Sequence, residues 1–187
     1  DYFCNRYYDV RCFGAVPGKP IENATIRGPI QIQFGRSIDP VYVQEHAIGR
    51  VVQNKSSKEG VDEVHGTFGA KHTVRYGLYR FAGHYSPFLA KRTGFNDADL
   101  KLFWEAITRW PSTDLSAARP SMGVRGLYVF QHADAFGNAP AQDLLSMVRI
   151  MELGSSDARS WDDYVDRISL PDESEVLPGV TFHRIIG

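Results

Sequence analysis

Apolar and polar residues alternate over residues 30–34, and this period of two is typical of a β-strand with one buried face. Ile30, Ile32 and Phe34 would share the buried face of that strand. Gln31 and Gln33 would lie on the opposite face, and their neutral amides suit contact with water or with a bound ligand. The pattern therefore predicts a half-buried strand in this part of the chain.

Two further strand-like segments flank a long polar interruption. Residues 41–52 and 71–85 are rich in β-branched and aromatic side chains, whereas residues 53–69 are polar, contain glycine and have neither a helical nor a strand period. An interruption of this length inside a compact domain is uncommon and is usually functional or disordered. Because its flanks carry Lys, Arg, His and Tyr, the sequence predicts two strands that carry a cationic finger, an insertion at about residues 44–76.

The second half of the chain predicts one clear helix and two more strands. Residues 95–110 place apolar side chains at helical spacing, and Pro111 is expected to end that helix. Residues 123–132 and 180–186 predict strands, the second at a sheet edge, and residues 141–153 predict a short helix or an extended segment. This order of elements indicates an α+β fold, similar to the later part of a ferredoxin-like βαββαβ unit.

Composition is consistent with a single domain over residues 1–187. The chain is 43% hydrophobic and 12% aromatic, which is enough for a core and argues against global disorder. The net charge of −1 argues against a general polyanion binder, but residues 1–93 carry +5 and residues 94–187 carry −6. This asymmetry predicts one face for an anionic partner and another for a basic partner or a further copy of the chain. Acidic residues concentrate in a C-terminal extension at about residues 154–187.

The sequence contains no pattern typical of catalysis or metal binding. Its six histidines form neither an i, i+4 pair nor a spacing with cysteine that suits zinc. A nucleophile motif of the Gly-x-Ser-x-Gly type and a phosphate-binding glycine loop are also missing. Cys4 and Cys12 lie among aromatic residues, which favours buried, reduced thiols in a cytoplasmic protein. We expect no enzyme activity, no metal and no cofactor. We also expect no membrane span, because no apolar segment approaches roughly 18–20 residues.

Three segments mix cations with amides or aromatic rings. Residues 27–36 place arginines at both ends of the first strand, residues 71–76 interleave cations with tyrosine, and residues 119–125 place two arginines around a methionine. Single-stranded RNA favours this mixture, because cations neutralise phosphates and rings stack on bases. Arg and Tyr also commonly cover a solvated sheet face, so both interpretations stay open on composition alone.

Four ordered motifs resemble those of a known family. They are residues 9–16 (DVRCFGAV), 26–40 (IRGPIQIQFGRSIDP), 71–79 (KHTVRYGLY) and 136–140 (FGNAP), with shorter matches at residues 93–95 and 116–119. Their order and separations resemble the backbone subunit of type I-C CRISPR surveillance complexes (Cascade), the Cas-seven group of the RAMP superfamily. The resemblance covers most of the chain, to about residue 153.

The resemblance implies an RRM-like palm with a β-hairpin thumb, here at about residues 44–76, and a non-catalytic role in binding the guide RNA (crRNA). Further copies of the protein would polymerise along one guide, beside other Cascade subunits, in the prokaryotic cytoplasm. Target DNA would then pair with the guide while the protein holds the backbone. The strand and the Asn/Gly-rich loop with which the family opens have no counterpart here. We therefore expect the N-terminal part to be missing and a sheet edge of the palm to be exposed.

Matched motifs and side-chain chemistry together give a set of candidate RNA contacts. Phosphate contacts should dominate, because a subunit that holds guides must accept any spacer sequence. Met122 is the one apolar candidate and would act as a wedge against a base. The candidates are Arg27, Gln31, Gln33, Arg36, Ser37, His46, Arg50, Lys71, His72, Arg119, Met122 and Arg125.

Two other roles stay open. A guide-processing endonuclease of the same superfamily would cut a repeat hairpin, with His46, His72 or Tyr76 as general acid or base. A scaffold without RNA contacts would need its basic half to be matched entirely by the acidic half of a neighbouring copy. Intact, salt-sensitive RNA binding would distinguish the guide-binding role from both.

Overall fold

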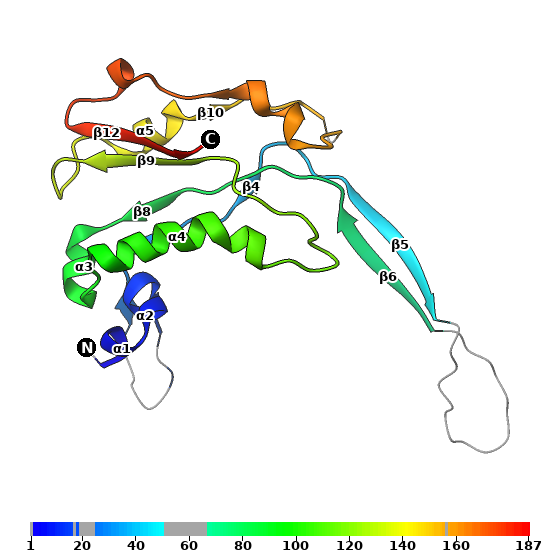
Figure 1. Cartoon of the computed structure of the whole chain (residues 1–187), viewed down its shortest axis with the longest axis horizontal. Coiled ribbons are helices and arrows are strands. Elements are labelled where there is room, and N and C mark those ends of the chain that lie inside the picture. Colours follow the sequence, from blue (N-terminus) through cyan, green and yellow to red (C-terminus); the bar gives the residue numbers. More distant parts are fainter. Residues whose placement is uncertain (1, 17, 19–24, 51–66, 156) are drawn as a thin grey trace. The chain divides into compact units, whose positions relative to one another are not determined.

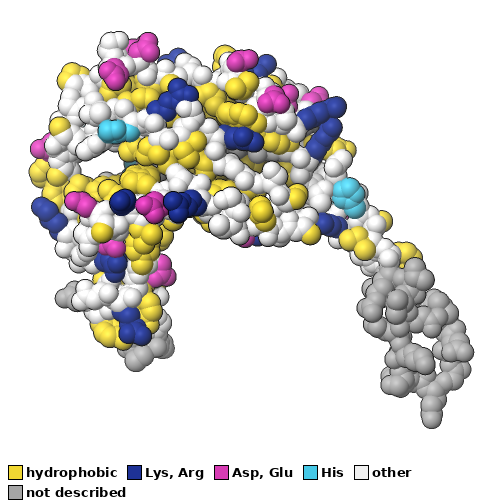
Figure 2. All heavy atoms as spheres, in the orientation of Figure 1, with side chains coloured by type: hydrophobic (Ala, Val, Ile, Leu, Met, Phe, Trp, Pro, Cys, Tyr) yellow, Lys and Arg dark blue, Asp and Glu magenta, His cyan; other side chains and the backbone are white. Residues whose placement is uncertain are grey.

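The computed structural model describes residues 2–16, 18, 25–50, 67–155 and 157–187. The chain forms two compact units. Unit 1 consists of Asp1–Arg36, Arg80–Ile150 and Ile168–Gly187, and unit 2 of Ser37–Tyr79 and Met151–Arg167. Helices and strands are both well represented (Figure 1), which confirms the predicted α+β class. On the face drawn in Figure 2, basic and acidic side chains are interspersed rather than gathered by sign.

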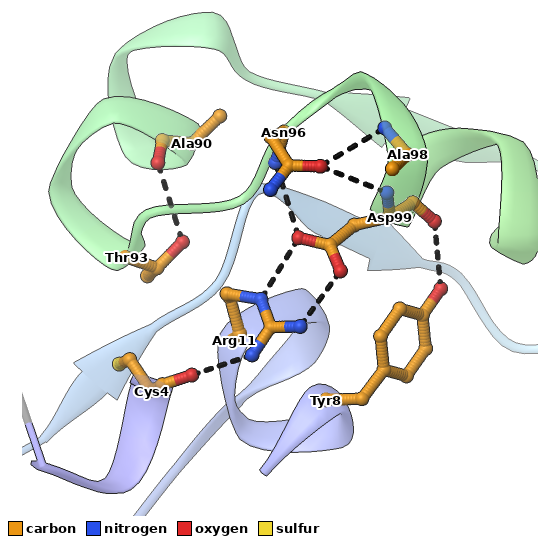
Figure 3. A network of polar contacts seen from close by, with 8 residues as sticks. All are labelled: Cys4, Tyr8, Arg11, Ala90, Thr93, Asn96, Ala98 and Asp99. Atoms are coloured by element: carbon orange, nitrogen blue, oxygen red, sulfur yellow. Dashed lines mark hydrogen bonds and ion pairs between the residues drawn. The ribbon is translucent and has the colours of Figure 1, made fainter. Parts of the chain in front are cut away.

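The α-helices that the structure describes all belong to unit 1. The Asn96 side chain accepts hydrogen bonds from the N–H groups of Ala98 (2.9 Å) and Asp99 (3.1 Å), and the Asp99 carboxylate accepts one from Asn96 N–H (3.2 Å; Figure 3). This reciprocal capping box fixes the start of the longest helix. No helix in the described ranges is both long and apolar enough to cross a bilayer. The helices are α1 (Tyr2–Arg6), α2 (Tyr8–Phe13), α3 (Pro87–Thr93), α4 (Asp97–Thr113) and α5 (Ala141–Met147).

The prediction that Pro111 ends the long helix is wrong. Helix α4 continues to Thr113, and the N–H of Asp114 donates to the carbonyl of Trp110. A proline this close to a helix C-terminus removes a single backbone hydrogen bond. The Pro111 ring is also buried. The loss of one bond is therefore offset by packing, and the helix keeps its last turn.

The core of unit 1 lies where α2, α3 and α4 meet strand β3. Its buried members come from four different elements or their flanks, and partly buried side chains of α2 and α4 pack around them. Strand β3 (Ile30–Ile32) pairs with β8 (Gly83–Tyr85). The buried core residues are Cys12, Ile30, Ala90, Phe95 and Phe103.

The strands of unit 1 form antiparallel pairs. Predicted strand 180–186 is confirmed as β12, and predicted strand 123–132 is confirmed in part as β9. Residues 141–153 contain α5 and then a short strand. The pairs are β1 (Gly14–Ala15) with β2 (Ile26–Arg27), β3 (Ile30–Ile32) with β8 (Gly83–Tyr85), β9 (Leu127–His132) with β12 (Val180–Ile186), and β10 (Arg149–Ile150) with β11 (Ile168–Ser169). The 3₁₀ turn η3 (Glu173–Glu175) also lies in unit 1.

The alternation at residues 30–34 predicted three buried side chains, and the structure buries one. Ile30 is 4% exposed, Ile32 is half exposed and Phe34 is 98% exposed. The helices cover β3 only at the end where Ile30 lies, so the buried face does not extend along the whole alternating segment. Residues 71–85, predicted as one strand, are also divided. Interruptions around Gly77 and at residues 81–82 separate β6, β7 (Tyr79–Arg80) and β8.

Unit 2 is built around the hairpin of β5 (Val43–Arg50) and β6 (Thr67–Val74), which lie within the predicted insertion. The register is continuous from Val43 opposite Val74 to Arg50 opposite Thr67. Residues 51–66, the centre of the insertion, lie outside the described residues. The unit also contains η1 (Trp161–Asp163) and η2 (Val165–Arg167). The predicted acidic extension, residues 154–187, contributes to both units. Strand β4 (Arg36–Ser37) and strand β7 each include residues of both units.

Candidate nucleic-acid interface

One group of candidate residues lies on the open face of β3 and β8. Gln31 is opposite His84 in the register, and the Gln33 amide nitrogen lies 3.4 Å from Nε2 of His84. All three side chains are exposed, as expected for the two glutamines. The sequence did not single out His84 as an RNA contact, because only the pairing of β3 with β8 brings it beside them. This group, Gln31, Gln33 and His84, is called the amide face below.

The Gln31 side chain is held in one orientation. Its Nε2 donates to the carbonyls of Phe13 (3.3 Å) and Gly28 (3.0 Å). Both donors of the amide therefore point toward the backbone of the protein, and the amide oxygen is the group that Gln31 can offer a ligand. The residue acts as a fixed acceptor on the amide face.

Arg27 and Arg36 are exposed side chains of unit 1. Arg27 lies in β2 opposite Gly14, at a place where two backbone segments come unusually close. A Cβ atom on Gly28 would lie 2.3 Å from the Cys12 carbonyl oxygen, and Gly14 has a φ of +92°. Only glycine fits both positions, so this contact fixes the strand that carries Arg27.

The loop candidates are less available than their sequence suggested. The Arg119 guanidinium binds the Asp114 carboxylate, with an Nη1–Oδ2 distance of 2.8 Å. Met122 is half-buried, whereas the predicted wedge would need an exposed side chain. Arg125 is exposed.

In unit 2, the hairpin separates its side chains onto two chemically different faces. Successive residues of a strand point to opposite faces, and residues directly opposite each other share a face. On the first, the polar face, His46 is opposite Lys71 and Gln44 is opposite Thr73, with Ile48 opposite Gly69 toward the far end. The second, the apolar face, consists of Val43, Ala47, Phe68, Ala70 and Val74, with Glu45 opposite His72.

The four candidates in the predicted insertion therefore do not form one cluster. His46 and Lys71 lie together on the polar face, and Nε2 of His46 is 3.0 Å from the Thr73 hydroxyl. His72 lies on the apolar face. Arg50 is opposite Thr67 in the register, and its side chain is outside the described part. Ser37 in β4 is half-buried.

The register of β5 with β6 also decides whether the two histidines proposed for the endonuclease alternative can act together. His46 and His72 point to opposite faces of a two-stranded ribbon, so they cannot act on one bond as an acid–base pair. The third candidate, Tyr76, packs against Tyr164 with ring centroids 6.3 Å apart. These three candidates, all in the described part of the chain, therefore do not form an assembled acid–base pair.

Cysteine and histidine in the described residues give no metal site. No three His, Cys, Asp or Glu side chains of that part lie close enough to share an ion. Cys4 and Cys12 are free and buried, as predicted, and burial raises the pKa of the Cys12 thiol to about 11. A thiol with so high a pKa stays protonated near neutral pH and is a poor nucleophile or ligand.

Comparison with known proteins gives the chain a family. No curated protein matches it. The family model described as CRISPR-associated protein Cas7 matches residues 1–170, which include all of unit 2, most of unit 1 and every candidate residue. The match extends beyond the resemblance found in the sequence, which reaches about residue 153. The chain therefore belongs to the Cas7 family of CRISPR-associated proteins, the crRNA-binding backbone subunits of CRISPR effector complexes.

Proposed function

We propose that this chain is a non-catalytic guide-RNA-binding subunit of a type I-C Cascade, with the hairpin as its thumb and unit 1 as an RRM-like palm. The observation that carries the proposal is the hairpin, which extends from unit 2 with both faces exposed (Figure 1). A ribbon of this kind buries no core of its own chain. Its side chains are free to contact a partner on either face.

The chemistry of the exposed groups suits RNA held without regard to sequence. Lys71 supplies a cation for a phosphate beside the His46 imidazole, and the amide face supplies hydrogen-bond donors and acceptors. Phosphate contacts give affinity for any spacer, whereas amides and imidazoles can bond to sugars and base edges. We further propose that several copies bind one guide in a filament, beside other Cascade subunits, and that target DNA contacts the complex by pairing with the guide.

The test is binding of a labelled guide-length RNA over a salt series, with fluorescence anisotropy and complex mass measured together. We expect a steep loss of affinity with salt, stepwise increases in mass and intact RNA. Lys71→Ala should lower the salt slope by about 0.7, the value for one phosphate contact to a single strand. Lys101→Ala is the matched control, because Lys101 is an exposed lysine of α4 outside the interface.

Three results would contradict the proposal in different ways. Cut RNA would favour the endonuclease. A single step in mass would exclude polymerisation along the guide. Equal salt slopes for Lys71→Ala and Lys101→Ala would remove the polar face of the hairpin from the RNA-binding surface.

A further inference from the structure

The hairpin is held in place only near its base, as far as the described residues show. The described side chains of its two strands are exposed except for Gln44 and Thr73, which are half-buried, and Phe68 at the far end is 83% exposed. Beyond the ends of β5 and β6, Arg75 N–H donates to the Tyr42 carbonyl (3.4 Å) and Ile38 N–H to the Leu78 carbonyl (2.8 Å). The direction in which the ribbon extends from unit 2 therefore depends on the contacts made at residues 37–42 and 75–79.

A buried polar pair lies at that base. The Tyr164 hydroxyl donates to Oδ2 of Asp39 at 2.8 Å, and the N–H of Gly154 donates to Oδ1 at 2.9 Å. Tyr164 is 1% exposed and Asp39 is 5% exposed. Both oxygens of the carboxylate thus have donors from the Met151–Arg167 segment, as a buried carboxylate requires.

The protonation states of the pair are well defined. Burial alone would raise the pKa of the Asp39 carboxyl, but hydrogen bonds from Leu153, Tyr164 and Gly154 outweigh it and lower the pKa. Burial, followed by the bond to Asp39, raises the pKa of Tyr164. At neutral pH, Asp39 is a charged acceptor and Tyr164 a neutral donor, which is the stronger kind of hydrogen bond.

Tyr164 also contacts the second chain segment at the base of the hairpin, the one that follows β6. Its ring stacks on Tyr76, with centroids 6.3 Å apart and planes inclined by 25°. Asp39 precedes β5 and Tyr76 follows β6, so one side chain contacts the chain on both sides of the ribbon. We call Asp39, Tyr76 and Tyr164 the hairpin brace.

We propose that Asp39 and Tyr164 are positioning residues for RNA binding, because the hairpin brace fixes the direction of the hairpin before RNA arrives. This inference rests on the proposed function and deepens it: the Met151–Arg167 segment pre-organises the RNA-binding hairpin without touching RNA. A surface held in its bound orientation loses less entropy on binding. When only a fraction of the molecules hold the hairpin in this direction, the apparent affinity is the intrinsic affinity multiplied by that fraction.

Tyr164→Phe is the sharpest variant, since it keeps the ring stack and removes only the hydroxyl. Amide hydrogen exchange without RNA should become faster at the base of the hairpin, at Ile38, Arg75 and Gly154, by roughly tenfold to a hundredfold, as expected for the loss of a hydrogen bond to a charged group. Affinity for guide-length RNA should fall by about fivefold to tenfold. The salt slope should stay unchanged, because the bound hairpin still makes the same phosphate contacts.

Tyr8→Phe is the matched control. The Tyr8 hydroxyl of unit 1 also makes an intramolecular hydrogen bond, to the Asp99 carbonyl at 3.0 Å. This variant should also lower Tm, by a smaller amount because its acceptor is a neutral carbonyl, and should leave both hairpin exchange and RNA affinity unchanged. Asp39→Asn is a second test in case Tyr164→Phe does not fold, and it should show the same pattern with a nearly isosteric side chain.

The possible outcomes distinguish a failure of the hairpin brace from a failure of the proposed RNA-binding function. Unchanged hairpin exchange in Tyr164→Phe and Asp39→Asn would overturn the brace, even if Tm falls. Faster exchange without a loss of RNA affinity, while the wild type binds RNA, would show that the brace does not serve binding. Failure of the wild type to bind RNA would refute the proposed function and the role of the brace in binding, and the exchange data would still decide whether the brace holds the hairpin.

Discussion

Removal of the Asp99 side chain should destabilise this protein strongly. Its Oδ2 accepts from Nε of Arg11 at 2.8 Å and its Oδ1 from Nη2 at 2.7 Å, a bidentate pair between α2 and α4 (Figure 3). Arg11 also donates from Nη1 to the Cys4 carbonyl at 2.7 Å. The side chains of Arg11 and Asp99 are only 18% and 10% exposed. Asp99→Ala therefore leaves a largely buried guanidinium without its counter-ion.

The magnitude follows from two separate losses. Breaking a buried ion pair from one side costs about 3–5 kcal/mol, and the residual exposure of both partners favours about 3 kcal/mol. The variant also removes the carboxylate that accepts from Asn96 N–H, which is half of a capping box and contributes about 0.5–1 kcal/mol. We expect Asp99→Ala to lower the free energy of unfolding by about 4 kcal/mol, measured by urea denaturation with linear extrapolation. Asp99→Asn keeps an acceptor and should cost about 2 kcal/mol.

The pH dependence gives a second readout of the same pair. The hydrogen bond from Arg11, together with that from Asn96, lowers the pKa of Asp99 against the opposing effect of burial. The unfolded chain then binds the proton more readily than the folded chain. The stabilisation is therefore complete above the unfolded pKa of about 3.9 and is lost as the pH falls through the lower folded pKa. The difference between wild type and Asp99→Asn should shrink below about pH 4. A cost for Asp99→Ala under about 1.5 kcal/mol, or a pH-independent difference, would refute this account.

Three further predictions concern unit 1. Gly28→Ala should lower the free energy of unfolding by more than about 2 kcal/mol in the same denaturation assay, because its Cβ would lie 2.3 Å from the Cys12 carbonyl oxygen. An unchanged free energy of unfolding would mean that this backbone contact can relax. Ile30→Ala should cost about 2–4 kcal/mol, because the Ile30 side chain is buried. Phe34→Ser should cost less than about 0.5 kcal/mol, because Phe34 is 98% exposed. Similar costs would show that the whole alternating face is covered. Arg119→Ala should change stability by less than about 1 kcal/mol, because its ion pair is exposed, and a larger loss would indicate a structural role for the loop.

The sequence predicted the features that depend on the local spacing of apolar residues. The class, the long helix, the strand at residues 180–186 and the pair of strands around the insertion all follow from spacings of two or 3.6 residues. How far a buried face extends did not follow. Ile30 and Phe34 belong to the same alternation, yet only the helices, which lie elsewhere in the sequence, decide which of them is covered.

Contacts between distant residues were beyond any local pattern. Asp39 and Tyr164 are 125 positions apart, and nothing near either residue indicates that they pair. His84 joins the amide face only through the register of β3 with β8. The same limit applies to the thumb candidates, where composition grouped His46 with His72 and the register places them on opposite faces. A hairpin register is set by the turn and by cross-strand contacts, neither of which a list of residue types contains.

No described side chain of β5 or β6 is buried. Folding therefore places little constraint on the residues of the hairpin, whereas binding to a partner would constrain them. In a library of single substitutions scored by protein abundance, β5 and β6 should tolerate most changes, whereas Asp99, Ile30 and Gly28 should tolerate few. The same library scored by guide binding should lose members in both regions. The positions depleted only in the second screen then mark the surface that contacts the partner. In this protein, the difference between two sequence profiles could therefore map an interface without a structure of the complex.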